Sequence, residues 1–255
     1  MSVEGSAGNP GKGRPTAAAV GAGDYLHLYT DEYHASHLDW ARAENRIFKH
    51  YLKAYCELIQ PRPGMRILEL GCSAGKTTRA LAERGCQVTA VDFDARAIDY
   101  ARRWLGESTD SQAAARVKFV CDSADRVPID PAQLDMITML DFVEHVPDGL
   151  LVSIFNHIRQ SGFRGPVCVY TPDRRHFTER MRDWGIIAQD PTHINLKSTP
   201  EWCRFVQAQG FTIQARRREV SHWPVLSKVE RAFSGLPGVG PWLTRSLSFR
   251  AVAQS

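Results

Sequence analysis

The 255-residue sequence has no long hydrophobic run. A membrane-spanning helix needs about 20 consecutive apolar residues, and no stretch approaches that length. The charges near the N-terminus are not followed by the apolar core of a secretory signal. We therefore expect a cytoplasmic protein with no membrane partner.

A strong excess of one charge is also absent. The chain has 32 Lys and Arg residues against 28 Asp and Glu, which gives a net charge of +4. A dedicated nucleic-acid-binding protein usually carries a strong basic stripe, so a nucleic-acid partner is not expected. The hydrophobic fraction of 43% is that of an ordinary globular protein with a full core.

The six cysteines follow no known pattern. None lies in a C-x-x-C pair, and no group of Cys and His residues has zinc-finger spacing. Several lie within apolar runs, where a free thiol behaves as a small hydrophobic group. Free cysteines of this kind favour a reducing compartment. The absence of metal-ligand spacing leads us to expect no metal site.

The chain begins with a segment of unusual composition. Residues 1–23 are rich in Gly, Ala, Pro and Ser, and we expect a disordered tail before a single domain that spans 24–255. From 31 to 60 the apolar residues recur at helical spacing, and Pro61 and Pro63 end this predicted helix.

Beyond these prolines, short apolar strands alternate with helices. Strands are expected at 65–70, 87–93, 117–121, 135–140, 165–170, 211–217 and 247–253, and helices at 75–84, 94–106, 149–162, 199–210 and 225–233. The helix after Asp94 should end at Gly106, and Thr199 should be the N-cap of a later helix that ends at Gly210. The alternation predicts an α/β fold with a doubly wound, mostly parallel sheet.

The stretch ILELGCSAGKTTRAL, at 67–81, contains a Gly-Lys-Thr triplet of the kind found in P-loops. A P-loop needs its first glycine at position 70, which is Leu70. A dinucleotide fingerprint that starts at Gly71 needs glycines where Ser73 and Lys76 stand. Neither phosphate-binding motif is therefore complete.

The pattern that remains is E-x-G-x-x-x-G between a strand and a helix. It starts at Glu69 and includes Gly71 and Gly75. About 20 residues later the second strand ends in Asp92, where a carboxylate can accept hydrogen bonds from both hydroxyls of a ribose. Ribose recognition without a phosphate clamp predicts a nucleoside ligand that carries no phosphates.

These residues resemble motif I of the class I S-adenosylmethionine (SAM) dependent methyltransferases. VKFVCDSADRVP resembles the adenine-binding segment after the third strand, and LDMITMLDFVEHVPD resembles the segment after the fourth strand of ubiquinone-biosynthesis type O-methyltransferases. The resemblance covers about residues 60–215. It implies a Rossmann-like, seven-stranded, mostly parallel sheet with an antiparallel last strand, an N-terminal helix and a lid-like insertion at 171–197. The implied cofactor is SAM, and the implied product is S-adenosylhomocysteine.

The resemblance also implies which side chains hold the cofactor. Glu69 should hold the methionine amino group and Asp92 the ribose, whereas Ser73 departs from the family's usual glycine. Asp122, Ser123 and Ala124 fall where the family contacts the adenine, and the register leaves the main contact open between Asp122 and Ser123. The full set of implied cofactor residues is Tyr33, Glu69, Gly71, Cys72, Ser73, Gly75, Asp92, Phe93, Asp122, Ser123, Ala124, Leu140 and Asp141.

The expected reaction is methyl transfer to a hydroxyl or an amine of a small molecule. A hydroxyl must lose a proton, and His145 and His193 are the candidate bases. Glu144 is interpreted as a helix-start carboxylate. The sequence after the fourth strand lacks the D-P-P-Y motif of DNA amino-methylating members. An RNA or protein methyltransferase and a non-catalytic SAM-binding protein remain as alternatives.

Overall fold

The computed structural model describes residues 26–33, 36, 46–108 and 110–254. The predicted disordered tail at 1–23 lies outside the described residues. Positions 34–35 and 37–45, in the first half of the helix predicted from 31 to 60, also lie outside them. The second half of that helix is present as α2 (Arg46–Ile59).

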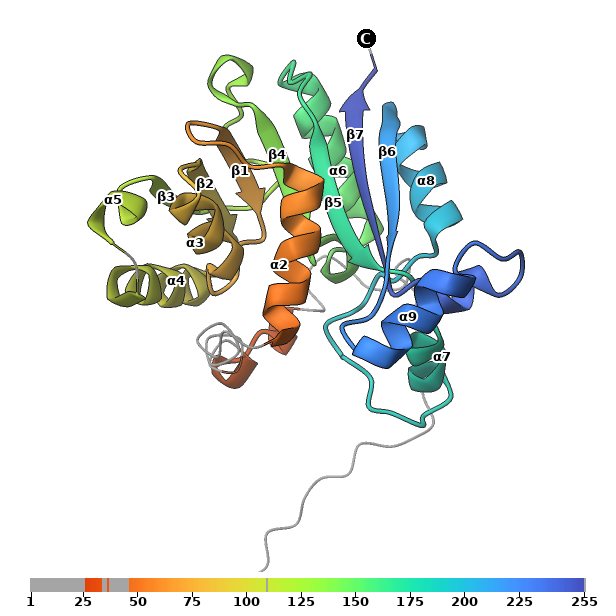
Figure 1. Ribbon diagram of the computed structural model, residues 1–255. Helices are drawn as coiled ribbons and strands as arrows, with labels where there is room; N and C mark the ends of the chain where they lie inside the picture. Colours follow the sequence, from red (N-terminus) through yellow and green to blue (C-terminus); the bar gives the residue numbers. More distant parts are fainter. Residues whose placement is uncertain (1–25, 34–35, 37–45, 109, 255) are drawn as a thin grey trace, which may run out of the picture.

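Within the described residues, seven strands form one sheet in the order β3-β2-β1-β4-β5-β7-β6 (Figure 1). The strands are β1 (Arg66–Leu70), β2 (Gln87–Asp92), β3 (Val117–Cys121), β4 (Met136–Leu140), β5 (Val167–Pro172), β6 (Phe211–Glu219) and β7 (Ser246–Ala253). β7 runs antiparallel to both β5 and β6, and the pairs among β1 to β5 are all parallel. The predicted sheet is therefore confirmed, including its antiparallel last strand.

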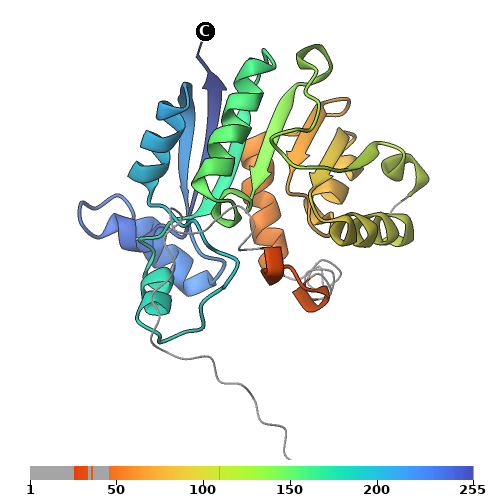
Figure 2. The ribbon, with the colours of Figure 1, turned by 180° about the vertical axis from the view of Figure 1, so that it is seen from behind.

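Helices cover both faces of this sheet and bury two apolar clusters. One face is covered by α2, α3 (Lys76–Glu83) and α4 (Ala95–Ser108), of which α2 lies in front of the sheet in Figure 1. Tyr55 and Ile98 belong to the apolar cluster beneath these helices. α6 (Asp148–Gln160) and α8 (Thr199–Ala208) pack on the other face, which Figure 2 shows, over a cluster that includes Phe155 and Trp202. The remaining helices are α5 (Ser111–Ala114), α7 (Phe177–Asp183) and α9 (Pro224–Phe233), with 3-10 turns at η2 (Leu26–Leu28), η3 (Pro131–Gln133), η4 (Val143–His145) and η5 (Gly240–Leu243).

Two helix ends differ from the predictions. α4 continues past Gly106 to Ser108, because Gly106 does not adopt the left-handed conformation with which a glycine ends a helix. The N-cap of α8 is Ser198 rather than Thr199, and Ser198 forms a capping box with Glu201. The hydroxyl of Thr199 instead donates a hydrogen bond to Asp173, 2.5 Å away.

The capping box gives a stability prediction. Ser198→Ala removes the side chain that satisfies the first turn of α8, and we expect the free energy of unfolding to fall by about 1 kcal/mol. Ser153→Ala is the matched control, because Ser153 is an exposed serine within α6 and should change stability by less than about 0.5 kcal/mol. Urea titration followed by circular dichroism measures both, and equal losses would contradict the role of the cap.

The parallel strands all end at one edge of the sheet, and the irregular segments gather there. α7, α9 and η5 lie at this edge, as Figure 1 shows below β5 and β6. Ligands of open α/β sheets bind at the carboxyl ends of their strands, so this edge is where a site is expected. No helix among the described residues is long and apolar enough to cross a membrane.

Candidate active site

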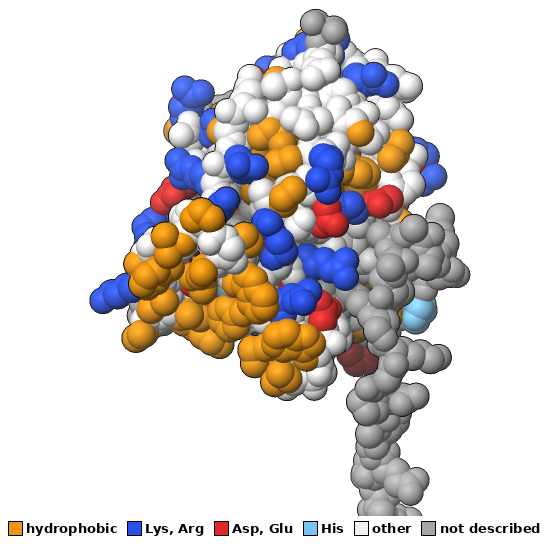
Figure 3. Space-filling model, turned by 90° about the vertical axis from the view of Figure 1, so that its right-hand side faces the viewer, with side chains coloured by type: hydrophobic (Ala, Val, Ile, Leu, Met, Phe, Trp, Pro, Cys, Tyr) orange, Lys and Arg blue, Asp and Glu red, His pale blue; other side chains and the backbone are white. Residues whose placement is uncertain are grey.

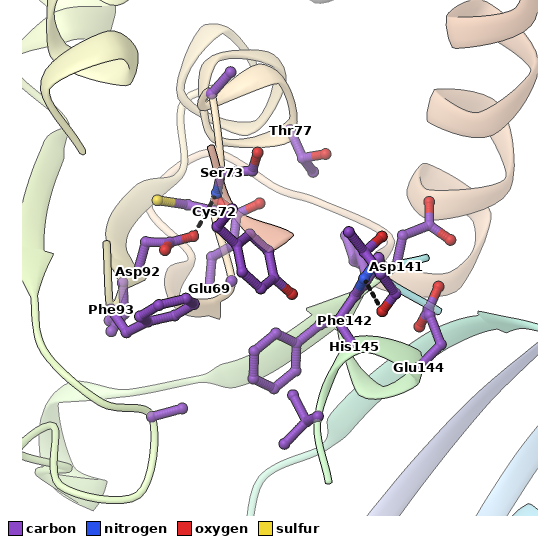
Figure 4. A pocket seen from close by; sticks show the side chains of 18 of the residues that line it. Glu69, Cys72, Ser73, Thr77, Asp92, Phe93, Asp141, Phe142, Glu144 and His145 are labelled. Carbon is purple, nitrogen blue, oxygen red and sulfur yellow. Dashed lines mark hydrogen bonds between the residues drawn. The ribbon is translucent and has the colours of Figure 1, made fainter. Parts of the chain in front are cut away.

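A cavity of about 1130 Å³ opens at the carboxyl edge of the sheet. Pockets for one small molecule usually measure about 300–1,000 Å³, so this cavity has room for a cofactor and a second molecule. Apart from Gly75, every residue that the sequence predicted for the site lines it: Tyr33, Glu69, Gly71, Cys72, Ser73, Asp92, Phe93, Asp122, Ser123, Ala124, Leu140, Asp141, His145 and His193. Figure 4 shows the part of the wall around the turn after β1 and the end of β4.

The turn after β1 has three residues with positive φ: Gly71 at 79°, Ser73 at 46° and Gly75 at 77°. A Cβ on Gly71 would lie 2.3 Å from Cδ2 of Phe142, so this position has no space for a side chain. Ser73 adopts a conformation that costs a non-glycine residue energy. Its backbone N–H donates a 2.9 Å hydrogen bond to Oδ2 of Asp92, which compensates for part of that cost.

Gly75, which belongs to the predicted cofactor set, does not itself line the cavity. It is the N-cap of α3, and a Cβ there would lie 2.9 Å from Cβ of Ala101 in α4. Gly75 therefore allows α3 to start close against α4. Lys76, which the sequence motifs left without a role, does line the cavity, and its Nζ lies 3.9 Å from the centre of the Phe48 ring.

Asp92 is held in a fixed orientation at the end of β2. Its Oδ2 accepts from Ser73, and its Oδ1 accepts from the backbone N–H of Asp94 at 3.0 Å. Each carboxylate oxygen can accept a second hydrogen bond, so the group remains able to bind hydroxyls. Phe93, next to it, is 44% exposed and makes an edge-to-face contact with Tyr29 at 5.3 Å.

The three predicted adenine-side residues follow β3 and all line the cavity. The backbone N–H of Ser123 donates to Oδ1 of Asp122 at 2.7 Å, and the Ser123 hydroxyl donates to Asp125 at 2.5 Å. The sequence left a choice between Asp122 and Ser123 for the adenine contact. Both remain candidates, because both face the cavity.

Glu69 is nearly fully buried at the end of β1. The hydroxyl of Thr78 donates a 2.5 Å hydrogen bond to its Oε2. Burial raises the pKa of Glu69 to about 7, and the hydrogen bond from Thr78 offsets only part of this increase. The side chain is thus poised to lose a proton when a cation arrives beside it.

Asp141 begins the segment after β4 with φ at 47°. It accepts a hydrogen bond from the hydroxyl of Tyr55 on α2, and its backbone N–H donates to the carbonyl of Tyr170 at 2.9 Å. The carboxylate faces the cavity, and desolvation raises its pKa to about 6. Sequence reasoning missed Tyr55, because its position fits the apolar stripe of the helix equally well.

His145 and His193 are 48 positions apart in the sequence, and the structure brings their rings to 4.9 Å between centres. Nδ1 of His145 lies 3.0 Å from the carbonyl oxygen of Thr192. A carbonyl only accepts, so Nδ1 carries the proton, and the lone pair of the neutral ring is on Nε2. Nε2 of His193 lies 3.6 Å from Oδ2 of Asp190.

Asp190 orients the loop at 190–195, which carries His193. Burial raises its pKa, but the charge of His193 and two hydrogen bonds from Thr192 outweigh burial and leave the pKa below its usual value. The loop is also joined to the segment after β4, because the N–H of Asn195 donates to the carbonyl of Glu144 at 2.8 Å. These bonds hold both histidines at one wall of the cavity.

Glu144 lies in the first turn of η4, as expected of a helix-start carboxylate. Its side chain is fully buried and accepts a 3.0 Å hydrogen bond from the hydroxyl of Thr171 through Oε2. Burial raises its pKa well above the usual value. One atom each of Glu144, His145 and His193 lie within 4.8 Å of one another, so these residues could hold a metal ion. Donors around one zinc ion stand about 3.4 Å apart, so the group would have to contract.

Arg245 also lines the cavity and was missed by sequence reasoning. It precedes β7, and its Nη1 donates to the hydroxyl of Thr178 at 2.8 Å and lies 3.4 Å from Glu179. No motif surrounds it in the sequence. It reaches the site only because β7 inserts between β5 and β6.

Known proteins resemble this chain in sequence. A family model described as a methyltransferase domain matches residues 40–216. A ubiquinone biosynthesis O-methyltransferase of Xanthomonas campestris is 38% identical over 90 residues, which are 35% of this chain and 36% of that protein. One of an Azoarcus species is 33% identical over 126 residues, 49% of each chain. The matches thus span between a third and a half of these relatives.

Solved structures show the same fold. The phosphoethanolamine N-methyltransferase 2 of Haemonchus contortus, in complex with S-adenosyl-L-methionine, has a TM-score of 0.63 at 18% identity, over 92% of this chain and 60% of that one. The magnesium protoporphyrin IX methyltransferase of Synechocystis, with bound S-adenosylhomocysteine, has a TM-score of 0.62 at 14% identity, over 89% of this chain and 99% of that one.

Proposed function

This chain belongs to the class I SAM-dependent methyltransferases, and from that premise we propose that it methylates a hydroxyl group of a small-molecule metabolite. The observation that carries the choice of a hydroxyl is the pair of histidines in the cavity wall. Attack by a hydroxyl on a methyl group requires removal of a proton, and an amine can attack from its neutral form without a base.

The residues around the turn after β1 fit the proposed cofactor. Asp92 would accept hydrogen bonds from the ribose hydroxyls, because two backbone N–H groups already orient its carboxylate. Glu69 would bind the amino group of the methionine part as a carboxylate. Phe93 would lie beside the adenine, with Tyr29 against its edge. When bound, SAM supplies a methyl group that is already activated by its sulfonium.

His145 is proposed as the general base. The Thr192 carbonyl fixes the proton on Nδ1, so Nε2 is the atom that would accept the proton of the acceptor hydroxyl. His193 and Asp190 lie beside it, and His193 is the second candidate for the same role. The protein otherwise contributes by aligning donor and acceptor and by excluding water from the cavity.

A screen of acceptors tests this proposal. The protein is incubated with methyl-labelled SAM and separate pools of phenols and quinols, sugars, amines, RNA and protein. We expect label in a small-molecule hydroxyl. Label in RNA or protein would favour those methyltransferase alternatives, and label in amines would favour N-methylation. Binding of SAM without product in any pool would indicate a non-catalytic SAM-binding protein.

The raised pKa of Glu69 gives a prediction for cofactor affinity. Below pH 7 the carboxyl is protonated, and binding a cation would require it to release that proton. We therefore expect the Kd for SAM to fall by up to about tenfold as pH rises from 5.5 to 7.0, and then to level off. Isothermal titration calorimetry in buffers of different ionisation enthalpy measures both the Kd and the proton released.

Glu69→Gln is the control for this titration, because Asp141 also changes charge near pH 6. The variant should bind SAM more weakly above pH 7 and should lose the part of the pH dependence that Glu69 contributes. An unchanged pH profile in Glu69→Gln would refute the assignment of Glu69 to the methionine amino group.

A further inference from the structure

A continuous apolar surface covers α9, η5 and the end of α7. Figure 3 shows hydrophobic side chains gathered over one lower region of the molecule, with Lys and Arg side chains beside them. We call this region the α9 surface. It consists of the exposed large hydrophobic residues Trp184, Ile186, Trp223, Val225, Val229, Phe233, Leu236, Val239 and Trp242.

Cation contacts join the two parts of this surface. The guanidinium of Arg180 in α7 lies 5.8 Å from the ring of Trp184 and 5.8 Å from the ring of Trp242. The residues from the insertion after β5 and those that follow α9 therefore form one patch. Monomeric proteins rarely leave such a contiguous apolar area uncovered, and a patch of this kind usually marks an interaction site.

α9 is turned so that its apolar side faces outward. Val225, Val229 and Phe233 recur every four residues and are 78%, 44% and 47% exposed. The inward-facing side carries Glu230, which is fully buried and lies 3.2 Å from Nε2 of the equally buried His176. A surface helix normally buries its apolar stripe.

Buried polar contacts fix this orientation. Besides its contact with His176, Glu230 accepts a 2.5 Å hydrogen bond from the backbone N–H of Ser221. Rolling the helix to bury its valines would carry a charged carboxylate away from both partners. The outward position of the apolar stripe is therefore a stable feature of the fold.

The charges near α9 are mostly basic, although Asp183, next to Trp184, is exposed. Between 216 and 242 the chain has five basic residues, Arg216, Arg217, Arg218, Lys228 and Arg231, all exposed, and two acidic ones. One of the acids, Glu230, is buried, and the other, Glu219, accepts a hydrogen bond from Ser248. An apolar centre with exposed tryptophans and a basic rim matches the interface of a bilayer that contains anionic lipids.

We propose that the α9 surface docks peripherally on an anionic membrane interface, a partner that the sequence, which lacks a spanning segment, did not lead us to expect. Tryptophan is favoured at the boundary of the headgroups and the acyl chains, and three of the six tryptophans of this chain lie on this surface. A second copy of the chain fits less well, because a two-fold contact would bring basic rim against basic rim. Docking would add to the proposed methyl transfer and does not depend on it.

Vesicle binding tests the proposal on the full chain. The protein is sedimented with vesicles of phosphatidylcholine alone and with vesicles that also contain phosphatidylglycerol, at two salt concentrations. We expect sedimentation with the anionic vesicles, a blue shift of tryptophan fluorescence, and weaker binding at high salt. Val229→Glu places a charge in the centre of the patch and should lower the partition coefficient about tenfold or more. Lys228→Gln should lower it about fivefold.

Gln112→Glu is the matched control, because it adds the same charge on α5, at the far side of the molecule from α9 (Figure 1). It should bind as the wild type does. Circular dichroism checks that Val229→Glu keeps the fold. Phe233→Ser is a second variant that replaces an apolar residue of the patch with a polar one. The proposal fails if neither vesicle binds the wild type. It also fails if the patch variants bind normally, or if light scattering shows a dimer that Val229→Glu dissociates.

Discussion

Replacing Asp92 with asparagine is expected to weaken the binding of SAM and of S-adenosylhomocysteine about 100-fold or more. The asparagine side chain would turn its amide NH₂ toward the N–H of either Ser73 or Asp94, where a carboxylate oxygen now accepts. The variant thus loses charge-assisted hydrogen bonds to the ribose and one anchor of the strained turn. Each such bond contributes about 1.5–3 kcal/mol, and about 1.4 kcal/mol is a tenfold change in Kd.

Calorimetric titration with S-adenosylhomocysteine measures this effect without knowledge of the acceptor. Asp130→Asn is the control, because Asp130 caps η3 through a 2.9 Å bond from Ala132 and does not line the cavity. It should leave the Kd unchanged. A Kd for Asp92→Asn within about threefold of the wild type would place the cofactor elsewhere and would overturn the proposed site.

Replacing His145 with glutamine should lower kcat for a hydroxyl acceptor by about 10² to 10⁴-fold and leave the Kd for SAM unchanged. Glutamine can still donate to the carbonyl of Thr192, but its amide cannot take up the proton of the acceptor. The variant separates orientation from proton transfer, because it keeps the hydrogen bond that positions the side chain.

His157→Gln is matched to this variant. His157 also bonds a backbone carbonyl, that of Val127 at 2.7 Å, and it lies outside the cavity. We expect normal turnover from it. If His193→Gln lost activity and His145→Gln did not, the base would be His193, with Asp190 as its partner. Normal rates from both cavity variants would exclude general-base catalysis by either histidine.

The fold follows from local patterns of the sequence. Strand and helix alternation located all seven strands to within about two residues, because a buried strand requires a short apolar run and a turn needs specific residues on either side. One of the two errors at helix ends occurred where a tertiary contact overrode local preference. Thr199 is a good N-cap by type, but its hydroxyl bonds Asp173 from a distant loop.

The residues of the site also fall into a part that the sequence predicts and a part that only the tertiary structure brings together. The sequence by itself determined the residues around the turn after β1 and the end of β2, because adjacent parallel strands bring Glu69, Ser73 and Asp92 to one edge of the sheet. Only the tertiary structure decided the rest. It placed His193 beside His145, buried Glu144 and aimed Arg245 into the cavity. It also turned the apolar stripe of α9 outward. These outcomes depend on contacts between residues 27 to 67 positions apart, whose energies no local pattern of residues records.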